Sequence, residues 1–201
     1  MSIFIRRASP SDRWDFAELM VISAPHFFPM LYGEDVKLIM SYLFARPHNL
    51  FSFQHVLFAE VEGEKAGMIL GYDRLLKRRE EARTGFLLAL FMKLDFIKKL
   101  LNFMRAKGAV GKVNEGEYYI SNLAVYPDFR GIGVGSGLLL EAEKKAKEEG
   151  ATWITLDVET INSTAIKLYR RFGYRVVGES SIRLEDETFH FLRMCKRLGD
   201  R

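Results

Sequence analysis

The sequence contains little cysteine and little histidine. Its one cysteine, Cys195, excludes an intramolecular disulfide and is typical of a protein from a reducing compartment. Because this thiol lies in an apolar run, we expect it to be buried and unreactive. The four histidines show no i, i+4 pairing and have no cysteine partner, so we expect no metal site.

Long hydrophobic runs are also missing. The most apolar stretch, residues 85–104, is interrupted by four charged side chains and falls short of the roughly 18 uninterrupted apolar residues of a membrane span. The first seven residues contain no apolar segment with a cleavage site, so no secretory signal is expected. These absences predict a cytoplasmic protein without a membrane partner.

Neither sign of charge dominates the composition. Thirty Lys and Arg side chains against 26 Asp and Glu give a net charge of +4, which suits a small polyanionic ligand. This excess is too weak to predict nucleic-acid binding. Much of it lies at residues 74–83, a basic run that resembles a solvated helix face.

The hydrophobic pattern predicts one domain over residues 1–201, because no linker, repeat or low-complexity segment divides the chain. Strands are expected at residues 3–7, 55–62, 66–72, 117–125, 153–158, 174–184 and 188–196. Helices are expected from residue 9 and at residues 34–44, 134–150 and 165–173. The first helix should bury Trp14, Ala17, Met20 and Val21, and an aromatic loop at 26–32 should follow it. This order of elements predicts a mixed α/β sheet with one open crevice.

Residues 73–114 form a largely helical insertion before the strand at 117–125. The insertion carries an apolar stripe at helical spacing, made of Phe86, Leu90, Leu94, Ile97, Leu101 and Met104. Such a stripe usually packs into a core. We expect it to pack and to wall a cleft, and a homodimer surface is the alternative.

A glycine-rich loop between a strand and a helix is the main functional signal. Residues 130–137 read Arg-Gly-Ile-Gly-Val-Gly-Ser-Gly, so four glycines remove side chains from the start of the helix. The first amides of a helix lack partners within the helix, and the helix dipole is positive there. This loop is therefore predicted to bind a phosphate or diphosphate, with Arg130 adding positive charge.

Three common glycine motifs do not fit this loop. The dinucleotide fingerprint would need a third glycine where Ser136 or Leu138 stands. A P-loop would need Gly-Lys-Ser/Thr at its end, and a nucleophile elbow would need glycine at Val134. An oxidoreductase or a nucleotide hydrolase is therefore disfavoured.

The pattern Arg-x-x-Gly-x-Gly does fit, and a second block stands at a matching distance from it. Residues 162–174 read Asn-Ser-Thr-Ala-Ile-Lys-Leu-Tyr-Arg-Arg-Phe-Gly-Tyr. This block resembles the Asn-x-x-Ala-x-x-Leu-Tyr-x-x-x-Gly-Phe signature of the GNAT superfamily of N-acetyltransferases, with Tyr174 in place of the last Phe. Residues 121–125 and 156–158 are similar to the enzymes that acetylate ribosomal-protein N-termini, whereas the insertion departs from those compact enzymes.

The resemblance implies a GNAT-like α+β fold, with a mixed, mostly antiparallel sheet splayed at the cofactor strand and flanked by helices. It implies acetyl-CoA as the cofactor. The residues expected to bind it are Leu123, Ala124, Val125, Arg130, Gly131, Ile132, Gly133, Val134, Gly135, Ser136 and Asn162. Asn162 is equally well explained as a helix N-cap. The first two helices and the aromatic loop would line the acceptor site.

The resemblance also suggests catalytic roles. Tyr169 would protonate the departing sulfur of CoA, although a tyrosine on a helix is otherwise most often a core residue. A base must take a proton from the amine, and Asp157, Glu117 and Glu159 compete for this role. Asp157 lies twelve residues before Tyr169, where the ribosomal-protein enzymes carry a glutamate. The sequence thus predicts transfer of an acetyl group to a primary amine, with a non-catalytic acyl-CoA sensor as the alternative.

Overall fold

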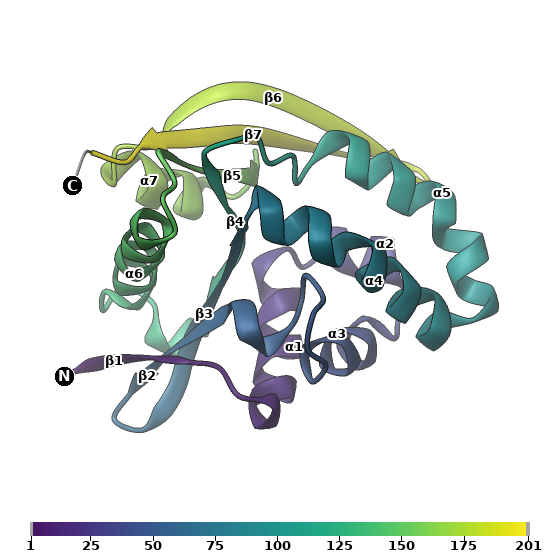
Figure 1. Ribbon diagram of the computed structural model, residues 1–201, viewed down its shortest axis with the longest axis horizontal. Coiled ribbons are helices and arrows are strands. Elements are labelled where there is room, and N and C mark those ends of the chain that lie inside the picture. The colour runs from purple at the N-terminus through teal and green to yellow at the C-terminus, as the bar shows by residue number, and fades with distance from the viewer. Residues whose placement is uncertain (1, 200–201) are drawn as a thin grey trace.

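Seven strands form one sheet, in the order β1-β2-β3-β4-β5-β7-β6, in the computed structural model, which describes residues 2–199 (Figure 1). The strands are β1 (Ile3–Arg7), β2 (Val56–Val61), β3 (Glu64–Asp73), β4 (Glu117–Val125), β5 (Trp153–Glu159), β6 (Arg175–Leu184) and β7 (Glu187–Arg197). Only β4 and β5 are parallel neighbours, and the other adjacent pairs are antiparallel. The predicted mixed, mostly antiparallel sheet is confirmed.

Helices cover both faces of this sheet. One face carries α1 (Arg13–Ser23), α2 (Phe27–Tyr32) and α3 (Val36–Phe44), and the other carries α6 (Val134–Glu148) and α7 (Ser163–Arg171). Alternation along β4 separates the two cores, because Tyr119 packs beneath α1–α3 and Tyr118 packs beneath α6. Single turns of 3-10 helix lie at Pro10–Asp12, Phe53–His55 and Pro127–Phe129. Among the described residues, no helix is both long and apolar enough to cross a bilayer.

Two local expectations were wrong. Residues 27–32 form the short helix α2 rather than a loop, because Pro29 occupies its third position, where a missing N–H costs no hydrogen bond. Trp14 is 52% exposed and lies against the Arg13 guanidinium. The chain reaches α1 through a 3-10 turn. In the resulting orientation of α1, Phe16 and Leu19 are buried instead of Trp14.

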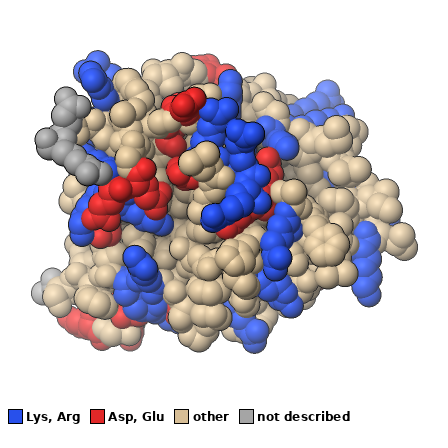
Figure 2. Space-filling view, viewed as in Figure 1, with Lys and Arg blue, Asp and Glu red and all other residues tan. Residues whose placement is uncertain are grey.

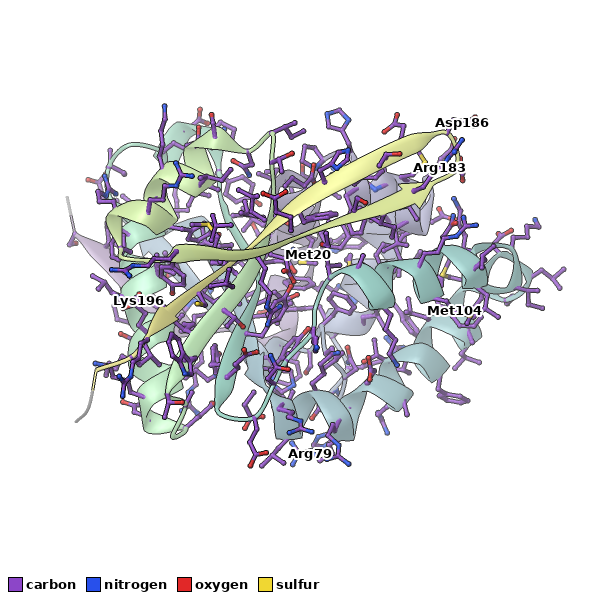
Figure 3. The ribbon with its side chains drawn as sticks, turned by 90° about the horizontal axis from the view of Figure 1, so that it is seen from above. Met20, Arg79, Met104, Arg183, Asp186 and Lys196 are labelled. Atoms are coloured by element: carbon purple, nitrogen blue, oxygen red, sulfur yellow. The ribbon has the colours of Figure 1, made fainter. Side chains whose placement is uncertain are left out.

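The insertion forms a helical hairpin of α4 (Arg74–Met92) and α5 (Leu94–Ala109), reversed at Lys93. It projects from one end of the molecule (Figure 1). The α5 helix packs against β6, whose hairpin tip with Arg183 and Asp186 lies beside it in Figure 3. Lys99 of α5 also pairs with Glu185 at that tip, at 3.1 Å. The hairpin is thus fixed at both its root and its far end.

The apolar stripe of the insertion does not pack into the core, contrary to expectation. Its six members are between 56% and 73% exposed. The opposite sides of the two helices are buried instead, through Leu87, Leu88, Met92 and Ala106. In Figure 2 this end of the molecule is largely uncharged, while Lys and Arg side chains gather over the start of α4. Spacing alone identified an apolar side of the hairpin but not the side that faces the sheet.

Asp12, at the entry to α1, is only 2% exposed and holds a network of donors. Arg6 donates two hydrogen bonds to its carboxylate, at 2.8 and 2.9 Å, and Lys65 lies 3.2 Å away. Burial alone would raise the pKa of Asp12, but the bonds from Arg6, Ser9 and Lys65 outweigh it and hold this pKa well below its usual value.

This lowered pKa predicts how stability depends on pH. The contribution of Asp12 is fully present above its unfolded pKa, near 3.9, and is lost as the pH falls toward the folded pKa. We expect Asp12→Asn to lower the free energy of unfolding by about 3 kcal/mol at pH 7, because it removes the buried anion shared by Arg6 and Lys65 and leaves Arg6 paired with Glu60 alone. The difference in free energy of unfolding between this variant and the unaltered protein, measured by urea unfolding, should be smaller at pH 3. Glu18→Gln, which breaks only the exposed pair with Lys37, should cost less than about 1 kcal/mol.

Candidate active site

The sheet opens where β4 and β5 stop pairing. Their register runs from Glu117 opposite Trp153 to Ile120 opposite Leu156 and ends there. Beyond this point β4 continues to Val125 along β3, and β5 continues to Glu159 along β7. The strands therefore part into a V whose inner edges do not pair with each other, and main-chain groups of residues 121–125 line one side of it.

A β-bulge lies at the start of this opening. On β3, Leu70 pairs with Asn122 and Gly71 pairs with Ile120, so Ser121 is an extra residue in β4. A bulge bends its strand and increases its twist. Gly67 of β3 then lies so close to β4 that a Cβ would meet the Ala124 carbonyl oxygen at 2.6 Å. The bulge and this close approach direct β4 away from β5.

The glycine loop lies at the mouth of the V and begins α6. Gly131 and Gly133 have φ angles of +80° and +99°, which side-chain-bearing residues rarely adopt, and a Cβ at Gly131 would meet nothing within 4 Å. Gly133 is the N-cap, so the first amides of α6 have no carbonyl partners within the helix. Arg130 donates to the Val125 carbonyl at 3.2 Å and therefore lies beside the end of β4. The loop offers bare amides and positive charge to an anion.

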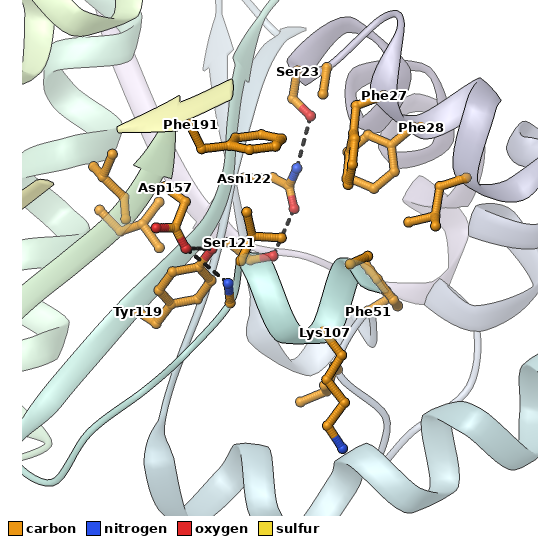
Figure 4. Close-up of a pocket in the computed structure, with 18 of the residues that line it drawn as sticks. Ser23, Phe27, Phe28, Phe51, Lys107, Tyr119, Ser121, Asn122, Asp157 and Phe191 are labelled. Carbon is orange, nitrogen blue, oxygen red and sulfur yellow. Dashed lines mark hydrogen bonds between the residues drawn. The ribbon is translucent and has the colours of Figure 1, made fainter. Parts of the chain in front are cut away.

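A cavity of about 340 Å3 begins at the V and continues under the insertion (Figure 4). Leu123, Asn162 and Tyr169 line it on the cofactor side. Aromatic side chains of α2 and α5 line its far part, as in the view of Phe27 and Phe28 in Figure 4. The structure thus joins β4, the motif at 162–174 and the insertion in a single cavity, whereas residues 130–137 of the glycine loop are not among the residues that line it.

Tyr169 is buried and lines this cavity from α7. Burial raises the pKa of its phenol above the usual value. Its hydroxyl therefore keeps its proton at neutral pH and can donate it. Asn162, seven residues earlier, accepts a hydrogen bond from the Ala165 amide at 3.1 Å, so the N-cap explanation of Asn162 holds while its side chain also reaches the cavity.

Asp157 lines the cavity, but its carboxylate is already engaged. Its Oδ2 atom accepts from the Gly111 amide at 2.9 Å and from the Tyr119 hydroxyl at 3.0 Å (Figure 4). Arg193 of β7 lies 3.5 Å from the same oxygen. This carboxylate therefore ties the exit of the insertion to the sheet.

The other two carboxylates differ sharply in position. Glu117 accepts from the Asn114 amide at 2.8 Å and pairs with Arg193 at 2.9 Å, and it is not among the residues that line the cavity. Glu159 does line it, and its Oε1 atom is buried without a hydrogen-bond partner. Burial raises the pKa of Glu159, and His26 lowers it by a smaller amount. Of the two candidate carboxylates that line the cavity, Asp157 is held by Gly111, Tyr119 and Arg193, whereas Glu159 has a buried oxygen without a hydrogen-bond partner.

The sequence profile of the Acetyltransferase (GNAT) family matches residues 16–174, which is most of the chain. The chain belongs to the GNAT acetyltransferase family. The match includes both the glycine loop and the helix of Tyr169. It also spans the insertion and strands β2 to β5, so the expected family assignment is confirmed.

Relatives of this GNAT chain agree with the assignment. GCN5-related N-acetyltransferase 4, chloroplastic, of Arabidopsis thaliana is 28% identical over 182 residues, which is 87% of this chain and 61% of that protein. The chain thus spans about three fifths of this relative. A crystal structure of an N-acetyltransferase from Staphylococcus aureus Mu50 is 25% identical with a TM-score of 0.69, covering 94% of this chain and 99% of that one. The ribosomal-protein-S18-alanine N-acetyltransferase from Escherichia coli, 16% identical, shares the fold with a TM-score of 0.60 over 100% of this chain and 96% of its own.

The GNAT site also contains residues that the sequence did not indicate. Arg171 of α7 donates to the Ser136 hydroxyl at 3.0 Å and so brings a second guanidinium to the glycine loop. Arg193 and Tyr119 hold Asp157. No local pattern marks these residues. Only the β5–β7 register, which places Asp157 opposite Arg193, would have indicated that pair in advance. Cys195 is partly exposed rather than fully buried, and burial still raises the pKa of its thiol.

Proposed function

We propose that this chain is an acetyl-CoA-dependent N-acetyltransferase that acts on a primary amine. The observation that carries the proposal is that the open edge of β4 and Tyr169 line one cavity, while the glycine loop begins α6 beside the end of β4, where Arg130 contacts Val125. A phosphate-binding loop alone would suit many ligands. An open strand edge and a protonated phenol beside it suit an extended acyl carrier that must receive a proton.

The residues present fit this cofactor. The bare amides of α6, with Arg130 and Arg171 beside them, would hold the diphosphate, since a helix N-terminus favours a bound anion. The unpaired edge of residues 121–125 would hold the amide-rich pantetheine arm through main-chain hydrogen bonds. When bound, acetyl-CoA supplies a thioester whose carbon–sulfur bond is exchanged for a carbon–nitrogen bond, while the amine loses one proton and the sulfur gains one.

The two proton movements are assigned to side chains that face the cavity. Tyr169 Oη holds the proton that the sulfur receives, and its raised pKa keeps it protonated until then. A carboxylate of β5, either Asp157 or Glu159, accepts the proton of the amine. Both residues line the cavity. Glu117 is not given a proton-transfer role, because it forms an ion pair with Arg193.

The proposal is tested by calorimetric binding of acetyl-CoA, followed by an assay of thiol release with a panel of primary amines and peptides. We expect saturable binding, together with amine-dependent release of free thiol and an acetylated product found by mass spectrometry. Binding without turnover on any amine would favour the sensor. A protein that binds no acetyl-CoA would refute the proposal.

A further inference from the structure

A continuous series of aromatic rings lines the cavity beyond the V. Phe191 of β7 contacts Phe27 with ring centroids 5.3 Å apart, and Phe27 contacts Phe28 at 5.9 Å. The series continues from Phe28 to Tyr32 at 5.9 Å, and from Tyr32 to Phe103 of α5 at 5.4 Å. All five rings line the cavity. Segments far apart in the chain therefore converge on one apolar chamber.

A carboxylate without a partner lies at one end of this series. Glu159 is directly opposite Phe191 in the β5–β7 register, so their side chains are neighbours on the same face. The buried Oε1 atom of Glu159 has no hydrogen-bond partner. A buried polar atom without a partner is costly, and a cation bound at this carboxylate would offset that cost. The raised pKa of Glu159 agrees with a carboxylate that lacks a cation.

The other charges of the cavity are already compensated. At the outer end, Glu81 pairs with Lys77 at 3.5 Å and with Lys107 at 3.4 Å. Asp157 is held by Arg193 and Tyr119. Among the described carboxylates that line the cavity, Glu159 has no ion pair with a Lys or Arg side chain, so it is the place where a ligand's positive charge would be compensated.

We propose that the acceptor is a primary amine on an aromatic or branched apolar body, with its ammonium group at Glu159 and its body among the rings of α2 and α5. This inference rests on the proposed function, because it names the substrate class of the same site. Glu159 orients the nitrogen and takes one proton from the ammonium before the carbon–nitrogen bond forms. The second nitrogen proton, lost as that bond forms and the carbon–sulfur bond breaks, replaces the proton that Tyr169 gives to the sulfur.

Size and charge exclude other amines. A cavity of about 340 Å3 is at the small end of the 300–1,000 Å3 usual for ligand sites, and it must also admit the end of the acyl carrier. A polyamine would place its second ammonium among apolar rings, where an unpaired charge is costly. The amine of a short peptide that begins with an aromatic residue has the same chemistry as a free arylalkylamine, so both are included in the test.

The insertion contributes the wall that makes this chamber selective. Phe96, Phe103 and Leu88 come from the two inserted helices, and they close the cavity on the side away from the sheet. Removing apolar contact there should reduce the preference for a large acceptor, since each buried methylene discriminates substrates by about tenfold or more.

The first experiment measures binding without acetyl-CoA, so that it does not depend on turnover. Calorimetry compares 2-phenylethylamine with 2-phenylethanol, propylamine and spermidine. We expect 2-phenylethylamine to bind at least about tenfold more tightly than each of the others. Equal or tighter binding of propylamine or spermidine would overturn the inference.

Variants then separate the two parts of the site. Glu159→Gln keeps the shape and removes the charge, so it should weaken binding of 2-phenylethylamine by about tenfold to a hundredfold and leave that of 2-phenylethanol unchanged. Phe103→Ala should weaken both ligands. Leu101→Ala, an exposed change on the same helix, should affect neither. Phe103→Leu repeats the comparison if the alanine variant unfolds.

Turnover with 2-phenylethylamine, propylamine and a tripeptide that begins with Phe completes the test. A kcat/KM for either aromatic amine that is higher than that for propylamine supports the inference. The better of the two aromatic amines shows whether the acceptor is a free arylalkylamine or a peptide. If the kcat/KM for propylamine equals or exceeds those for both aromatic amines, the inference fails while the proposed function stands. If acetyl-CoA does not bind at all, the proposed function fails, and the calorimetry still decides whether the cavity takes an aromatic amine.

Discussion

Gly133→Asp is expected to abolish acetyl-CoA binding. The change adds a carboxylate at the N-cap of α6, where the first amides of the helix would otherwise meet a diphosphate. Two like charges about 4 Å apart near a protein surface repel by about 4 kcal/mol, which corresponds to an increase in Kd of roughly a thousandfold. Isothermal titration calorimetry with acetyl-CoA measures this effect directly.

The control for this variant is Gly150→Asp, at the opposite end of α6. Gly150 also has a positive φ, of +81°, and open space around it, so an aspartate there introduces similar backbone strain. We expect it to destabilise the fold modestly while leaving the Kd for acetyl-CoA unchanged. If Gly133→Asp bound acetyl-CoA as well as Gly150→Asp does, the glycine loop would not be the diphosphate site.

Tyr169→Phe is expected to lower kcat by about 100-fold or more and to change the Kd for acetyl-CoA by less than about twofold. The phenyl ring keeps the packing of α7, and only the hydroxyl that holds the proton is removed. General acids contribute about 10²- to 10⁴-fold to rates. Stopped-flow detection of free thiol gives kcat, and calorimetry gives the Kd.

Tyr174→Phe provides a matched comparison. Its ring centroid is 5.7 Å from that of Tyr169, and it is equally buried, but it is not among the residues that line the cavity. Turnover in this variant should equal that of the unaltered protein. Equal turnover in Tyr169→Phe as well would remove the phenol from the chemistry and leave it a packing residue.

The proposed acceptor chamber would give the insertion a role in this GNAT chain. Under the proposed function the V between β4 and β5 is the donor side, and residues within the family match build it. The chamber needs a third wall, and α4 and α5 supply that wall from Leu88, Phe96 and Phe103. A change in the insertion should therefore alter the choice of acceptor and leave acetyl-CoA binding intact.

Local chemistry made much of the fold predictable. The strand at 3–7 and the strand at 117–125 were placed at their observed bounds, because alternating apolar residues between turn residues leave few other conformations. The hairpin between β2 and β3 was indicated by Gly63, which has the positive φ that its turn requires. The α6 start was indicated in the same way, by glycines that only a tight loop needs.

Orientation around a helix was harder to predict. Trp14 and Phe16 are both apolar and two residues apart, and only packing of α1 on the sheet decides that Phe16 is buried. The same ambiguity misplaced the stripe of the insertion. Periodicity shows that a helix has an apolar side. A helical hairpin with apolar residues on two sides, however, can pack on the sheet with either side.

The sequence by itself determined the family, and it predicted the phosphate loop and the role of the tyrosine, since each depends on residues that are close together in the chain and on backbone conformations that glycine permits. Only the tertiary structure decided which carboxylate is free at the cavity. Asp157, Glu117 and Glu159 are chemically alike, and their roles are set by whether Arg193, Tyr119 or Asn114 reaches them. These partners come from other strands and turns, so the distinction arises from long-range contacts that no local pattern encodes.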